Sequence, residues 1–168
     1  LNVSRVVVYQ HKSIIGKVRY DLMNDTFSSI WMEVGLPKKK KILVCNIYRE
    51  WQYLQQDDNS SSTINEQLVR WNSFLDQWER ALLENKEVVV LGDMNLNHLN
   101  WNQQDLHPSN QTYKLRPLID QLFEKIFPHG VSQLVTVPTR SWTNQVDTGL
   151  DHIYSNIPAK LSEIQVQS

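Results

Sequence analysis

Apolar residues along this chain gather in short runs separated by polar stretches, and most of these runs have the length of β-strands. Each run either alternates apolar with polar residues or is continuous and β-branched, patterns typical of strands that bury one face or both. Gly35-Leu36-Pro37, followed by four lysines, predicts a solvent-exposed hairpin turn between two of them. We expect strands at residues 5–9, 28–34, 42–48, 87–92, 133–137, 150–154 and 164–166.

Two longer segments have helical spacing instead. Thr63-Ile64-Asn65-Glu66 is a capping-box sequence, and behind it apolar residues recur every three or four positions as far as Leu82. This spacing predicts an amphipathic helix that packs on a sheet, with its tryptophans in the core. A second helix is expected at residues 117–127, because Pro117 suits a first helical turn and Pro128-His129-Gly130 ends the pattern. Hairpins mixed with helical crossovers predict an α/β or α+β fold with mixed sheets.

Composition narrows the function classes only slightly. The 168 residues suit one domain with a real core. With 17 basic and 18 acidic residues, the net charge gives no general attraction for nucleic acid, but a local basic groove is compatible with it. No apolar run is long enough to span a bilayer, so we expect no transmembrane helix and no membrane partner. Cys45, the single cysteine, lies in an apolar run and is expected to be a buried thiol. The chain opens without methionine, almost at once on a strand-like segment, which suggests a fragment.

Candidate chemistry follows the apolar run 87–92. Gly92 lets the backbone turn or approach another group closely, and Asp93 and Asn95 then follow two positions apart. If the extended geometry continues through Asn95, both side chains project to the same side at the end of a buried strand, where α/β proteins commonly hold their chemistry. The alternative is an Asx turn after the strand, since Asp and Asn favour turns for local reasons.

Four short motifs occur in a fixed order along nearly the whole chain: Asn46-Ile47-Tyr48-Arg49, Gly92-Asp93-Met94-Asn95, Pro138-Thr139-Arg140 and Leu150-Asp151-His152-Ile153. Together they resemble the endonuclease/exonuclease/phosphatase superfamily, and more closely the apurinic/apyrimidinic-type endonuclease domain of non-LTR retrotransposons. The resemblance implies a four-layered α/β sandwich, in which two packed mixed β-sheets are flanked by helices. The chain would then be a single domain over residues 1–168, truncated at both ends.

The resemblance also implies chemistry, namely phosphodiester cleavage with Mg²⁺ or Mn²⁺. Tyr48 would contact the scissile phosphate, and Asp93 would activate the attacking water. Asn95 would hold that water or a phosphate oxygen, and Asp93 and Asn95 would be the metal ligands within this chain. Asp151 would orient a catalytic histidine. These residue types suit the reaction, because a metal and hydrogen-bond donors neutralise phosphoryl charge and a carboxylate removes a proton from water.

Further positions take supporting roles by the same resemblance. Thr139 matches a hydroxyl residue that supports the site, and Arg49, Arg140 and Trp142 lie beside motif positions from which they could touch DNA.

Two parts of the family pattern are absent from this sequence. The family's asparagine and metal-binding glutamate would precede residues 4–9, and its Ser-Asp-His segment would follow residue 168. His152 does not replace the missing histidine, because on a strand it points opposite to Asp151. We therefore expect little or no nuclease activity from these 168 residues.

The leading hypothesis is a metal-dependent, strand-nicking DNA endonuclease domain of a retrotransposon reverse transcriptase polyprotein, acting inside the cell, in the nucleus. A second hypothesis keeps the fold but assigns a phosphatase or phosphodiesterase that acts on lipid or small-molecule phosphates. A third is a non-catalytic remnant that at most binds nucleic acid.

Overall fold

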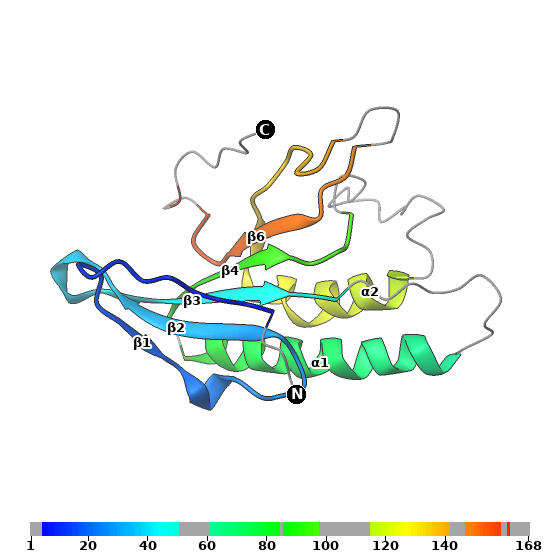
Figure 1. The fold of residues 1–168 in the computed structure, drawn as a ribbon, viewed down its shortest axis with the longest axis horizontal. Helices are drawn as coiled ribbons and strands as arrows, with labels where there is room; N and C mark the ends of the chain where they lie inside the picture. Colours follow the sequence, from blue (N-terminus) through cyan, green and yellow to red (C-terminus); the bar gives the residue numbers. More distant parts are fainter. Residues whose placement is uncertain are drawn as a thin grey trace.

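A computed structural model describes residues 5–50, 61–84, 86–97, 115–141, 147–158 and 161 of the chain. One six-stranded mixed sheet, in the order β1-β2-β3-β4-β6-β5, packs its inner face against two α-helices (Figure 1). Only β3 and β4 pair in parallel, and helix α1 connects them. The strands are β1 (Gly16–Val18), β2 (Ser29–Gly35), β3 (Lys41–Tyr48), β4 (Glu87–Asp93), β5 (Ser132–Gln133) and β6 (Asp151–Ser155), and the helices are α1 (Ser61–Leu83) and α2 (Arg116–Lys125).

The central strands agree with the sequence pattern. The runs 28–34, 42–48, 87–92 and 150–154 became β2, β3, β4 and β6, with ends shifted by one residue. The predicted hairpin turn between β2 and β3 is present and contains the 3₁₀ turn Pro37–Lys39.

Two expectations at the sheet margins were wrong, and one short strand was missed. Residues 5–9 form no strand, and Val7 and Tyr9 are exposed, so an apolar, β-branched run was not enough to place this segment in the sheet. The run 133–137 shortened to β5, because the amide of Val135 donates to the Gln133 side chain instead of to a strand. The three-residue β1 was missed, being too short to show a period. Residues 164–166 lie outside the described part of the chain.

Both helices are present, with different ends. Helix α1 begins at Ser61, two residues before Thr63, so the prediction of Thr63 as the N-cap was wrong. Helix α2 ends at Lys125 and is followed by the 3₁₀ turn Phe127–His129. Gly130 then takes a left-handed conformation (φ 74°) and caps the 3₁₀ turn, so the helical segment as a whole ends at Pro128-His129-Gly130, as the sequence predicted.

The core lies between the helices and one face of the sheet. Trp71 and Trp78 of α1 are fully buried, as predicted, and the Trp71 indole donates to the Leu118 carbonyl of α2 at 2.9 Å. Tyr154 of β6 packs edge-on against Trp78. Cys45 of β3 is buried in the same core, and burial raises the pKa of its thiol well above the usual value. Apolar burial on this face is the main term that holds the helices on the sheet.

The described residues confirm the α/β class and contain one sheet with one helical layer. A second sheet, as in the expected four-layered sandwich, is not among them. Within the same residues, no helix has both the length and the apolar character needed to cross a membrane.

Candidate functional site

Three of the predicted site residues form a row across three neighbouring strands. Tyr48 of β3 is in register with Asp93 of β4, and Asp93 is in register with Asp151 of β6. Register partners point to the same face of a sheet, and neighbouring strands lie roughly 5 Å apart. Their chain neighbours Ile47 and His152 are buried against the helices, so the row lies on the opposite face. Tyr48 and Asp93 are half-buried there and Asp151 is exposed.

Gly92 explains how β4 reaches this position. Its φ is 138°, and a Cβ atom built on it would collide with the carbonyl oxygen of Ile47 in β3. Any larger residue would push the two parallel strands apart just before Asp93. The glycine at the end of the apolar run is therefore needed for a close backbone approach, one of the two roles expected of it.

The chain turns directly after Asp93. Asn95 has φ 48°, and its backbone amide donates to Asp93 Oδ1 at 2.8 Å. The Asx-turn alternative is therefore correct, and the expectation that Asp93 and Asn95 project together from an extended strand was wrong. The physical reason is local, since the Asp93 carboxylate captures the amide two residues on. The Asn95 side chain is buried, and its amide nitrogen donates to the Arg49 carbonyl at 2.6 Å.

Arg49 fixes the turn from the other side. Its guanidinium donates to the carbonyls of Met94 and Asn95 and, at 3.1 Å, to Gln67 of α1. Its backbone amide donates to the Asp93 carbonyl at 2.9 Å. The side chain is only 6% exposed, and this burial lowers the pKa of Arg49 to about 10. The geometry gives Arg49 a structural role at the site, and its predicted contact with DNA stays untested.

His152 adds a third support that sequence reasoning missed. Its ring lies on the helix-facing side, opposite to Asp151 as expected, and its Nε2 lies 2.7 Å from the Leu96 carbonyl. Its Nδ1 lies 2.8 Å from the Tyr154 hydroxyl. Three consecutive carbonyls, those of residues 94–96, are thus bonded by buried side chains. The available signal was the spacing of His152 and Tyr154, which places both on one face of a strand.

Thr139 joins its loop to the start of β6. Its hydroxyl oxygen accepts from the amides of Leu150 (3.0 Å) and Asp151 (3.1 Å). Arg140, which is exposed, forms a backbone bridge with Thr148 in the same region. Thr139 therefore sets the backbone position of Asp151. Trp142, the remaining predicted contact, lies outside the described residues.

The electrostatics of the row centre on Asp93. Burial is the main cause that raises the pKa of the Asp93 carboxyl, and the nearby charge of Asp151 acts in the same direction. The Asn95 amide and the charges of Arg49 and Arg140 oppose this rise. The Asp93 carboxyl is costly to ionise and lies beside the Asp151 carboxyl. A cation bound between the two would therefore stabilise both in their charged form.

The donor set fits a hard divalent cation. Mg²⁺ is commonly bound by one or two carboxylates and completes its shell with waters and substrate phosphates. Asp93 and Asp151 supply two carboxylates on paired strands. The residues that the structure describes contain no group of three or more histidine, cysteine, aspartate or glutamate side chains that could form an all-protein cage. The predicted ligand Asn95 has its amide nitrogen engaged by Arg49, so its role as a ligand stays a prediction.

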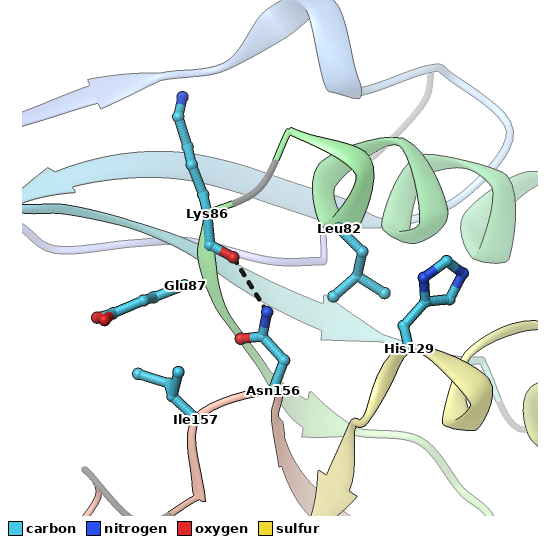
Figure 2. Close-up of a pocket in the computed structure, with 6 residues that line it drawn as sticks. All are labelled: Leu82, Lys86, Glu87, His129, Asn156 and Ile157. Atoms are coloured by element: carbon cyan, nitrogen blue, oxygen red, sulfur yellow. Dashed lines mark hydrogen bonds between the residues drawn. The ribbon is translucent and has the colours of Figure 1, made fainter.

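An open pocket of about 340 Å³ lies at the other end of β4 and contains none of the predicted site residues. The ammonium of Lys86 points away from the other lining side chains, and the Asn156 amide is used in a hydrogen bond to the Lys86 carbonyl (Figure 2). The polar groups therefore do not converge on the space. The lining residues are Leu82, Lys86, Glu87, His129, Asn156 and Ile157.

Comparisons with known proteins concern the fold. The sequence matches no protein-family model, and a comparison with curated proteins found no match. The structure is similar to the endonuclease domain of TRAS1, a telomere-specific non-LTR retrotransposon, with a TM-score of 0.53 and 16% sequence identity. The similarity covers 88% of this chain and 55% of that one, so the chain spans about half the length of that structure. The chain therefore shares a fold with a retrotransposon endonuclease domain, and membership of the wider superfamily stays a prediction.

Proposed function

We propose that this chain carries the site of a divalent-metal-dependent DNA endonuclease of the non-LTR retrotransposon kind. The observation that carries the proposal is the row Tyr48, Asp93 and Asp151, which strand register aligns on one face of the sheet. A phenol, a carboxylate with a raised pKa and a second carboxylate are the groups that phosphodiester hydrolysis uses. The endonuclease fold of the similar structure supports DNA as the substrate.

Each side chain has a defined task in this proposal. Asp93 takes a proton from the attacking water through the oxygen that does not serve the Asn95 amide, and its raised pKa makes it a better base than an ordinary carboxylate. The Tyr48 hydroxyl donates to a phosphate oxygen beside it. When bound, Mg²⁺ or Mn²⁺ neutralises charge that develops on the phosphoryl oxygens. Asp151, whose backbone amide donates to Thr139, would hold the cation or orient a histidine.

The wider setting is part of the same proposal. A nicking endonuclease of this kind would work in a polyprotein with a reverse transcriptase, in the nucleus, and would supply a 3′-hydroxyl for DNA synthesis. The two carboxylates of the described site lack a histidine partner on their face of the sheet, because His152 is turned to the helices. We therefore expect the 168 residues alone to nick weakly.

The test is nicking of supercoiled plasmid with Mg²⁺, comparing this chain with versions extended at each end within its own reading frame. Asp93→Asn is the matched control, because an asparagine oxygen can still accept the Asn95 amide and so preserves the turn. Nicking that Asp93→Asn reduces by at least about 100-fold supports the proposal. Nicking that is unaffected by Asp93→Asn, or hydrolysis of phosphomonoesters without nicking, overturns it.

A further inference from the structure

At the end of the sheet that carries the row, two arginines also lie around one glutamate. The Arg5 guanidinium lies over the ring of Tyr48, 5.9 Å from its centroid, and Arg5 Nε lies 3.3 Å from Glu50 Oε1. Arg70 of α1 approaches the other oxygen, with Nη1 3.6 Å from Glu50 Oε2. The N-terminal segment, dark blue in Figure 1, passes across β2 and β3 in this view, and Arg5 within it contacts Tyr48 at the end of β3. Three separate segments thus form one cluster, Arg5-Glu50-Arg70.

The charges of this cluster are loosely paired. At the other end of the sheet, Glu33 accepts from Lys41 at 2.6 Å and from Lys86 at 2.7 Å, and these bonds lower the pKa of Glu33 to about 2. Glu50 instead serves two guanidiniums at 3.3 and 3.6 Å. The side chains of both arginines are 50% exposed and that of Glu50 is 31% exposed. Two cations sharing one hydrated carboxylate leave an excess positive charge.

A phosphate would compete well for these arginines. Guanidinium groups bind phosphate oxygens through paired N–H donors, and such charge-assisted bonds are stronger than long, solvated ion pairs. The cluster is also in the right place, because Arg5 covers Tyr48 and Tyr48 is next to Asp93 across the strands. The distance from Asp93 to the cluster is on the order of 10 Å, so neighbouring phosphates of one DNA strand could reach both places.

We propose that Arg5 and Arg70 form a phosphate-binding rim for the DNA strand beside the cleavage site, with Glu50 as an internal competitor that the phosphate displaces. This inference rests on the proposed function, because it assigns the contact surface of the same site. It predicts effects of opposite sign within one cluster. Removing the glutamate charge frees both arginines and strengthens binding, whereas removing either arginine weakens it.

The experiment measures fluorescence anisotropy of a labelled duplex oligonucleotide with EDTA present, so that binding is recorded without cleavage. Glu50→Gln should tighten binding by roughly threefold or more. Arg5→Ala and Arg70→Ala should each weaken it and lower the slope of log affinity against log salt by about one. Arg80→Ala is the control, because Arg80 also lies on α1 but donates to backbone carbonyls.

A double-mutant cycle separates the rim from general charge effects. The cycle is measured in a chain that carries both Arg5→Ala and Arg70→Ala. Glu87→Gln in the same chain gives the effect of losing one negative charge elsewhere. Without the two arginines, Glu50→Gln should tighten binding no more than Glu87→Gln does. Arg5→Lys and Arg70→Lys, which keep the charge, should restore part of the affinity. Circular dichroism confirms that each variant is folded.

Two results would overturn the rim: arginine variants that bind like Arg80→Ala, or Glu50→Gln that leaves binding unchanged or weaker. If nicking that depends on Asp93 is retained in that case, the proposed function stands and only the rim fails. If the rim variants change binding as expected but no Asp93-dependent nicking occurs in any version, the rim stands and the catalytic proposal fails. Absence of binding at low salt overturns both.

Discussion

Arg49 and Asn95 hold each other's backbone: the Arg49 guanidinium donates to the Asn95 carbonyl at 2.7 Å, and the Asn95 amide donates to the Arg49 carbonyl at 2.6 Å. The two residues follow the neighbouring parallel strands β3 and β4, and the clamp joins motifs that are 46 positions apart in the sequence. Between them lies Asp93, whose carboxylate is part of the same turn. The position of the proposed base therefore depends on two side chains that are themselves buried.

The clamp makes Arg49 a residue on which stability depends. We expect Arg49→Ala to lower the free energy of unfolding by roughly 3 kcal/mol, because the carbonyls of Met94 and Asn95 lose their buried donors. Arg80→Ala should change it by less than about 1 kcal/mol, since two of the bonds of Arg80 are 3.4 Å long and exposed and the third, at 3.1 Å, is only partly buried. Urea denaturation followed by tryptophan fluorescence measures both. Equal losses in the two variants would contradict the clamp.

Two glycines with positive φ should respond very differently to alanine. At Gly92 (φ 138°) the new Cβ would collide with the Ile47 carbonyl, so we expect Gly92→Ala to cost roughly 3–5 kcal/mol and to separate β3 from β4. At Gly130 (φ 74°) the new Cβ would meet nothing within 4 Å, so Gly130→Ala should cost only about 1–2 kcal/mol. Thermal melting of both variants compares them directly. A larger loss at Gly130 would mean that β3 and β4 are not in the close contact described.

Two substitutions at Thr139 distinguish the role of its hydroxyl group from the role of its packing. Thr139→Val keeps the shape of the side chain but leaves the amides of Leu150 and Asp151 without their acceptor, which should cost about 1–3 kcal/mol. Thr139→Ser keeps the oxygen and should lose less. Chemical denaturation gives the two free energies of unfolding. The same order should appear in nicking by an active, extended chain if Thr139 positions Asp151, whereas Ser behaving like Val would reject the hydroxyl role.

The raised pKa of Asp93 predicts how stability depends on pH. A carboxyl whose pKa is higher in the folded state destabilises that state once it ionises, so its cost is absent at low pH and complete at neutral pH. Asp93→Asn carries no such charge. Its stability relative to the unmodified chain should therefore rise as pH increases from about 3 to 7. Urea denaturation at several pH values measures the difference, and a difference that falls over this range would show that the Asp93 charge stabilises the fold.

The sequence was sufficient where burial imposes a strict period. The strands β2, β3, β4 and β6 followed from alternation or from a continuous apolar run, and the tryptophan face of α1 followed from helical spacing, because each of these elements buries at least one face in the core. The segment 5–9 has an equally apolar, β-branched run and forms no strand, because a continuous hydrogen-bond ladder depends on tertiary structure as well as on the local pattern. Pairing partners are set by tertiary structure, which a single segment does not encode.

The candidate site also combines features that the sequence predicted with features that only the tertiary structure determines. The motifs named Tyr48, Asp93 and Asp151 as candidates, but their alignment depends on strand register, which no motif specifies. The family resemblance led us to expect that Asn95 holds the water or a phosphate oxygen and that Arg49 could touch DNA. The structure buries both, since the turn after Asp93 leaves carbonyls that need donors. A polar residue in a motif can thus serve the backbone that presents the chemistry instead of the chemistry itself.

The row of Tyr48, Asp93 and Asp151 also makes catalysis a reporter of correct folding. A strand that slips by one residue turns every side chain to the opposite face. A slip of β6 against β4 would send Asp151 toward the helices and bring His152 to the open face, while the sheet kept most of its hydrogen bonds. Such a misfolded chain would look ordered by circular dichroism and yet lack the row. Chemical competence of this protein is therefore a stricter measure of native strand pairing than its content of secondary structure.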